Sequence, residues 1–169
     1  MADFGLSSYD AGVLVAERDT AQYFEKVVEG HDPKLAANWV IGNLFAVLKE
    51  KSVGIAASPV SAESLSKLLD LLKNDTISSR IAKDVFEIMA NNGKEAIVIV
   101  EEKGLKQITD MGAIEAAVDD VIAKSPEQVG QYKSGNEKIA GWFVGQVMKA
   151  TQGKANPPLV NQMLKDKLK

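Results

Sequence analysis

Apolar residues recur at helical spacing along most of this 169-residue chain, and residues that start or stop helices separate the repeats. Residues that favour the N-cap position precede several of these repeats, as at Asp32 and Ser61. Only the run Ile97-Val98-Ile99-Val100 has strong strand propensity, and no other segment is a convincing partner for it. We therefore predict a short helix within residues 94–104 and an all-α fold.

The first 108 residues are expected to form a helical bundle domain. Helices are predicted after the segment 7–10 and over residues 19–29, 33–51, 61–74 and 76–93, with Thr76 capping the last of these and Gly93 ending it. The helix that begins at Pro33 is apolar on nearly all sides, which is typical of the centre of a bundle.

Residues 105–109 are expected to connect this domain, 1–108, to a small three- to four-helix tail domain, 109–169. Tail helices are predicted from Thr109 or Asp110, from Ser125 to Gly135, from Asn136 to Thr151, and from Asn156 onward. The core-facing side chains of the third are expected to be Ile139, Trp142, Phe143 and Met148. Gly141 and Gly145 are expected to let two helices pack closely.

The inventory of reactive side chains argues against catalysis and against a metal site in this chain. There is no cysteine, and the one histidine, His31, lies in a Gly-His-Asp-Pro sequence that predicts a solvated turn. Gly153-Lys154 does not complete a phosphate-binding loop, because Met148 and Ala155 stand where glycine and Ser or Thr are needed. No apolar run is long enough for a membrane span, and no secretory leader is visible, so a cytoplasmic location is expected.

Charge is distributed unevenly along the chain, whose formal net charge is −3. From Lys133 onward there are seven lysines and two acids, a net of +5, whereas the preceding 132 residues hold 13 basic and 21 acidic groups, a net of −8. A basic end on an acidic body can attract a polyanion. A solvated lysine-rich terminus is the alternative interpretation.

Four polar residues surround the predicted corner between the last two helices: Lys149, Thr151, Lys154 and Asn156. The free N–H groups at the start of the last helix are expected to point at this corner and to form an anion seat together with the lysines. A well-capped corner with solvated lysines explains the same residues, and the sequence leaves both interpretations open.

The segment 145–157, Gly-Gln-Val-Met-Lys-Ala-Thr-Gln-Gly-Lys-Ala-Asn-Pro, resembles the C-terminal signature of the B subunit of the glutamine-dependent aspartyl/glutamyl-tRNA(Asn/Gln) amidotransferase. The end of that family shares a domain with YqeY-like proteins. Further segments agree with it in order along the chain: 5–11, 32–39, 104–108 and 132–135.

The resemblance implies that the catalytic chemistry lies outside these residues. In that family a preceding catalytic cradle binds ATP and magnesium, phosphorylates the carboxylate of a mischarged tRNA and replaces the phosphate with ammonia from glutamine. No cofactor is therefore expected in this chain, which would be a non-catalytic part of an ATP-dependent ligase subunit. The implied partners are tRNA(Gln) or tRNA(Asn), an amidase subunit and a small linker subunit.

The resemblance also implies that the tail helps to select and position tRNA. The RNA-binding candidates in this sequence are Lys133, Ser134, Lys138, Lys149, Thr151, Lys154 and Asn156. Because the only arginines are Arg18 and Arg80, we expect the tail to recognise phosphates and shape. The alternative is a protein-interaction module that docks on partner subunits without direct RNA contact.

Overall fold

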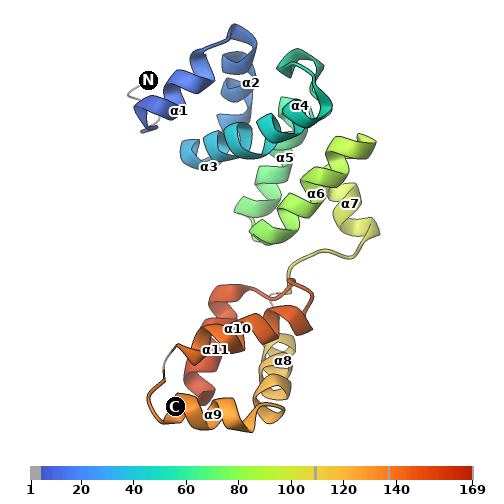
Figure 1. Ribbon diagram of the computed structural model, residues 1–169. Helices are drawn as coiled ribbons and strands as arrows, with labels where there is room; N and C mark the ends of the chain where they lie inside the picture. Colours follow the sequence, from blue (N-terminus) through green and yellow to red (C-terminus); the bar gives the residue numbers. More distant parts are fainter. Residues whose placement is uncertain (1–4, 109, 137, 169) are drawn as a thin grey trace. The chain divides into compact units, whose positions relative to one another are not determined.

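A computed structural model describes residues 5–108, 110–136 and 138–168 (Figure 1). Over these ranges the chain is helical, and the single β-type contact is an isolated parallel bridge between Ile108 and Ala155. The predicted all-α fold is confirmed. The helices divide into two compact units, Met1–Gly104 and Leu105–Lys169. None of the helices in the described ranges combines the length and apolar character that crossing a bilayer requires.

The first unit consists of short helices, and several of them begin where the sequence predicts. Its elements are α1 (Ser8–Val15), α2 (Arg18–Val28), α3 (Pro33–Asn38), η2 (Trp39–Leu44), α4 (Phe45–Lys51), η3 (Ile55–Ala57), α5 (Ala62–Lys73), α6 (Ser79–Asn92) and α7 (Ala96–Glu102). Asp32 and Ser61 are confirmed as N-caps, and the structure adds Ser7, because the side chain of each accepts a hydrogen bond from the backbone N–H three residues later.

The predicted helix over 33–51 is interrupted by a π-helical segment, η2, between α3 and α4. Hydrogen bonds in a π segment span one residue more than in an α-helix, and this shifts the register of the side chains that follow. Trp39, Val40 and Leu44 are buried here, and the Trp39 ring packs edge-on against Phe86 at a centroid distance of 5.6 Å. The segment therefore contributes these three side chains to the core of the first unit.

The predicted cap at Thr76 is wrong. The Thr76 N–H donates to the carbonyl of Leu71 (2.9 Å) while Asp75 adopts a left-handed conformation with φ 52°, so Thr76 completes the end of α5. The N-cap of α6 is Ser78, whose hydroxyl oxygen accepts from the Ile81 N–H at 3.3 Å. A residue that closes one helix in this way is not placed to start the next.

The β-branched run over 97–100 is helical, as predicted, and lies in α7. Ile99 and Val100 are buried, and α7 packs against α5 and α6. Gly93 is confirmed as the residue that ends α6, because it has φ 70° and its N–H donates to the Met89 carbonyl at 2.8 Å.

The prediction of a solvated His31 is wrong. Its side chain is only 2 % exposed. Nδ1 lies 2.9 Å from the carbonyl oxygen of Val27, and Nε2 lies 3.2 Å from Oδ1 of Asp70. The ring therefore links the end of α2 to α5, which are distant in sequence.

The second unit contains α8 (Met111–Ala123), α9 (Pro126–Lys133), α10 (Ile139–Ala150) and α11 (Pro157–Leu168). In Figure 1, α10 and α11 lie side by side and pack on α8. Their common core consists of Ile114, Val118, Val121, Phe143, Val147, Ala155, Val160, Met163, Leu164 and Leu168. Asp110 caps α8, since its Oδ1 accepts from the Ala113 N–H at 2.7 Å, and Thr109, the other expected start, lies outside the described residues. The predicted start of α10 at Asn136 is three residues too early.

The segment that precedes α8 belongs to the second unit. Ile108 donates its N–H to the Lys154 carbonyl (2.6 Å), and its own carbonyl accepts from the Asn156 N–H (3.3 Å). The structural division between Gly104 and Leu105 therefore falls four residues before the domain boundary expected after residue 108.

Candidate nucleic-acid interface

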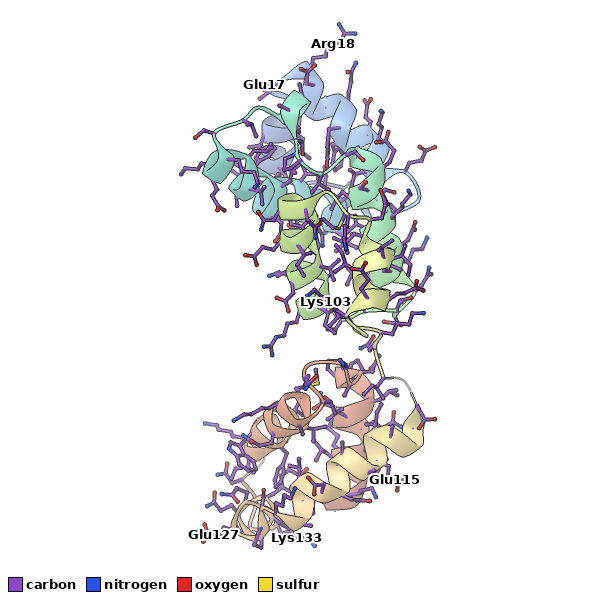
Figure 2. The ribbon with its side chains drawn as sticks, turned by 90° about the vertical axis from the view of Figure 1, so that its right-hand side faces the viewer. Glu17, Arg18, Lys103, Glu115, Glu127 and Lys133 are labelled. Carbon is purple, nitrogen blue, oxygen red and sulfur yellow. The ribbon has the colours of Figure 1, made fainter. Side chains whose placement is uncertain are left out.

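The candidate RNA-binding residues lie in two groups at the two ends of α10. Lys133 and Ser134 end α9 and Lys138 immediately precedes α10, whereas the remaining four candidates lie at or beyond its last turn. Figure 2 shows Lys133 at the end of the second unit away from its connecting segment. Since α10 has 12 residues, the groups are separated by about 18 Å of helix. The structure thus does not bring all seven candidates into one cluster.

Thr151 and Asn156 shape the corner between α10 and α11. The Thr151 hydroxyl donates to the Val147 carbonyl at 2.9 Å and accepts from the Ala155 N–H at 3.4 Å. Asn156 Oδ1 accepts from the Leu159 N–H at 3.2 Å. These bonds hold the chain where Gln152 and Gly153 both take positive φ values, 55° and 77°. The two polar side chains therefore fix the backbone that carries Lys149 and Lys154.

Of the two interpretations left open for this corner, the well-capped one describes its backbone, and the described residues at the start of α11 have no free N–H group. The first two residues of the helix, Pro157 and Pro158, have no N–H group. The next N–H is that of Leu159, which Asn156 Oδ1 already accepts, and the Val160 N–H donates to the Asn156 carbonyl at 3.0 Å. The first helical turn therefore has no free amide for an anion, a conclusion that Pro158 already indicates in the sequence.

All four candidate lysines are available for an external anion. Lys133, Lys138 and Lys149 are exposed and Lys154 is partly exposed. Among the residues that the structure describes, no acid forms an ion pair with any of them. Ser134 is also exposed, although its hydroxyl already donates to the Gln131 carbonyl at 2.8 Å.

Lys167, in contrast, is committed to the protein itself. Its Nζ lies 2.7 Å from a carboxylate oxygen of Asp119 and 2.8 Å from Oε1 of Glu115, both on α8. Hydrogen bonds to Asp119 and then to Glu115 raise the pKa of Lys167 above its ordinary value. Lys167 therefore contributes less to an external anion site than the lysine count of the C-terminal segment suggests.

Trp142 does not face the core, contrary to the prediction. Its side chain is 40 % exposed, whereas Phe143 is fully buried and Ile139 and Met148 are partly buried against the core. The expected close helix packing at Gly141 and Gly145 is also wrong, because a Cβ added at either glycine would meet no heavy atom within 4 Å. Trp142 is thus a surface residue that the sequence analysis missed. The i, i+3, i+4 spacing of Lys138, Gly141 and Trp142 was the signal that could have revealed it.

The described ranges contain no group of three His, Asp or Glu side chains placed to hold a metal ion. Fold and surface together define an all-α protein whose second unit has exposed lysines that form no ion pair with an acid in the described residues. The chain belongs to the GatB domain family, which it matches over residues 22–168.

Curated relatives agree with the resemblance seen in the sequence. The chain is 62 % identical over 168 residues to the B subunit of the aspartyl/glutamyl-tRNA(Asn/Gln) amidotransferase of Rhodospirillum rubrum, covering 99 % of this chain and 35 % of that protein. Its counterpart in Paramagnetospirillum magneticum is 55 % identical over 168 residues, with the same coverage. That of Roseobacter denitrificans is 57 % identical over 166 residues, covering 98 % of this chain and 33 % of the relative. The chain spans about a third of the length of these relatives.

Proposed function

We propose that this chain is the tRNA-binding part of an amidotransferase B subunit. It would help to select and position mischarged tRNA(Gln) or tRNA(Asn) for transamidation by a catalytic cradle outside these residues. The observation that carries the proposal is the set of exposed or partly exposed lysines without acid partners around α10, within the described part of an otherwise acidic chain. The relatives' names specify a tRNA-dependent enzyme, and this supports tRNA as the polyanion that the lysines bind.

In this proposal the lysines contact RNA phosphates as point charges. Lys133 and Lys138 act at the start of α10, and Lys149 and Lys154 act at its end. Ser134 accompanies the first pair, while Thr151 and Asn156 position the second pair through the hydrogen bonds of the corner. Because arginine is absent from residues 105–169, recognition depends on the spacing of phosphates and on the shape of the RNA.

The same proposal assigns ATP and magnesium to the cradle and glutamine hydrolysis to an amidase subunit, with a small linker subunit completing the complex. This chain contributes affinity and orientation, and its own residues perform no group transfer.

The proposal can be tested by reversing the charge of Lys149 and Lys154, the two lysines at the corner between α10 and α11. We expect Lys149→Glu combined with Lys154→Glu to weaken tRNA binding at least tenfold and to reduce its salt dependence, because each lost phosphate contact lowers the slope of log K against log salt by about 0.7–0.9. Fluorescence anisotropy with labelled tRNA at several salt concentrations measures both effects, and circular dichroism verifies the helical content.

The matched control is Lys34→Glu combined with Lys83→Glu, which changes the net charge equally at exposed positions of the first unit. This control should bind nearly as tightly as the unchanged chain. Equal losses in the two double variants, or an affinity for tRNA that is independent of salt, would contradict the proposed function.

A second candidate function, docking on partner subunits, is favoured by an apolar surface of the first unit. Between α1 and α2 lies a cavity of about 150 Å³ lined mainly by apolar side chains, including Leu6, Leu14, Val15 and Phe24. Val15 is 48 % exposed. If Val15→Glu abolished binding to the partner subunits and tRNA produced no gel shift at low salt, this second function would replace the first.

A further inference from the structure

Five residues form one exposed face of α10, which we call the outer face: Lys138, Gly141, Trp142, Gly145 and Lys149. Their spacing of three, four, seven and eleven residues from Lys138 places them within about 100° around the helix axis. Phe143 and Val147 lie on the opposite side and are fully buried in the core of the second unit. The outer face is therefore the solvent side of an amphipathic helix.

A tryptophan in the middle of this face is unusual, because an exposed indole forgoes the large stabilisation that burial provides. The other tryptophan of the chain, Trp39, is only 4 % exposed, whereas Trp142 is 40 % exposed. Trp142 packs edge-on against Phe143, with a centroid distance of 5.1 Å and an interplanar angle of 82°. This contact with a fully buried ring restrains the indole at the surface.

The surface beside the indole is open. Gly141 and Gly145 occupy the neighbouring positions on the outer face, and a Cβ at either would meet nothing within 4 Å. No side chain at these positions shields the tryptophan from an approaching flat molecule. A planar group can therefore reach the ring over a part of the helix that presents only backbone.

Charge on the outer face indicates what kind of planar group fits. Lys138 and Lys149 lie on either side of Trp142, about 16 Å apart along the helix axis. Neither forms an ion pair with an acid in the described residues, and the outer face itself contains no acid. An exposed aromatic ring between two free cations matches a nucleotide strand, whose bases are planar and whose backbone is anionic.

We propose that Trp142 stacks on an unpaired base of the bound RNA while Lys138 and Lys149 contact the flanking phosphates. The inference rests on the proposed function and adds to it a contact that is selective for single-stranded RNA. Stacking requires an unpaired, accessible base, so the outer face binds a loop or an end of the RNA more tightly than a continuous duplex.

Three variants at one position test the stacking contact in the full chain. We expect Trp142→Ala and Trp142→Leu to weaken tRNA binding by about 5- to 150-fold, the range seen for base–aromatic stacking, and Trp142→Phe to retain most of the affinity. The salt dependence should stay the same in all three, because no phosphate contact is removed. Thermal unfolding of Trp142→Leu should match that of the unchanged chain, since the leucine keeps much of the apolar contact.

A second probe separates stacking from other roles of the tryptophan. A single-stranded RNA oligonucleotide should lose affinity for Trp142→Leu, whereas a blunt RNA duplex should bind both proteins equally. If Trp142→Leu binds tRNA normally while the Lys149→Glu, Lys154→Glu double variant does not, stacking is wrong and the proposed function stands. If neither change affects tRNA binding, both proposals fail. If Trp142→Leu instead impairs only the binding of a partner subunit, the outer face is a protein interface and stacking is overturned.

Discussion

At the scale of single residues, Asn156 and Pro158 decide what the corner between α10 and α11 can bind. The two prolines at the start of α11 have no N–H group. The first N–H of the helix is that of Leu159, and it donates its hydrogen bond to Asn156 Oδ1. A phosphate at this corner must therefore be held by the side chains of Lys149 and Lys154. The corner presents mobile point charges in place of fixed backbone donors, which favours adaptable contact over strict geometry.

Replacing the cap of α11 should destabilise the second unit. We expect Asn156→Ala to lower the free energy of unfolding by about 1 kcal/mol, because the Leu159 N–H loses its partner. Asn156→Asp keeps a capping oxygen and should retain most of the stability, while its negative charge weakens tRNA binding. Urea unfolding followed by circular dichroism measures the first effect. Equal stability of Asn156→Ala and the unchanged chain would show that the cap is unimportant.

Residues with local roles were predictable, and residues whose role depends on distant contacts were not. The capping oxygens of Asp32 and Ser61 act within three residues, so a short window of sequence contains all the information. His31 contacts Asp70 of α5, which is 39 residues away in the sequence, so a short window of sequence does not predict its burial. Trp142 is exposed because the buried stripe of α10 passes through Phe143, and the sequence indicates this only through the spacing of Trp142 from Lys138 and Gly141.

At the scale of elements, α10 contains two glycines that no neighbouring helix requires. Both lie on the outer face with open space around them. We expect Gly141→Ala and Gly145→Ala each to raise the free energy of unfolding by about 0.5–1 kcal/mol, because alanine has the higher helix propensity. Thermal unfolding measures the change. A loss of stability would instead indicate that another helix approaches this face closely.

The start of α7 is predicted to stabilise the fold in a pH-dependent way. Glu95 accepts hydrogen bonds from the Ser64 hydroxyl (2.8 Å) and from Lys67 Nζ (3.1 Å). Both contacts lower the pKa of Glu95 below its ordinary value, and the bond from Ser64 has the larger effect. A depressed carboxylate pKa stabilises the folded state above the unfolded-state pKa, and this stabilisation is lost as the pH falls through the folded-state pKa.

Glu95→Gln removes that contribution. We expect the variant to be less stable than the unchanged chain at neutral pH, by no more than about 1 kcal/mol because the pair is partly exposed. The difference should begin to shrink near the usual glutamate pKa of about 4.3 and disappear as the pH falls through the lower folded-state pKa of Glu95. Urea unfolding at a series of pH values checks this, and a difference that persists at low pH would contradict the assigned cause.

Most elements of the fold follow from local sequence, while their boundaries depend on how neighbouring elements end. Thr76 has the right residue type for a cap, but the end of α5 already uses its N–H group. Asn136 likewise has a favoured side chain, yet α10 begins only at Ile139. In both cases a competing turn, invisible in residue preferences, sets the boundary.

At the scale of the whole molecule, the chain forms two units, and the residues that connect them belong to only one of the two. The connecting residues belong to the second unit, because Ile108 packs against its core and bonds to the backbone on both sides of Ala155. We predict that a chain of residues 105–169 folds and that one of residues 109–169 is less stable by about 1–3 kcal/mol, since it lacks two hydrogen bonds and a partly buried isoleucine.

Thermal unfolding of the two truncated chains measures this difference, and Ile108→Ala in the longer chain provides a control that keeps both backbone hydrogen bonds. It should fall between the two truncated chains in stability. If residues 105–169 and 109–169 unfold at the same temperature, the bridge between Ile108 and Ala155 does not contribute to folding.

The bridge between Ile108 and Ala155 also has a mechanical consequence. Because the two hydrogen bonds of the bridge tie Ile108 to the corner, tension along the chain from Gly104 acts on them. The load arrives directly at Lys154 and Asn156, the residues that flank Ala155. A pull on the connection is thus transmitted to the backbone of the corner between α10 and α11, which carries Lys154, one of the two lysines proposed to hold phosphate.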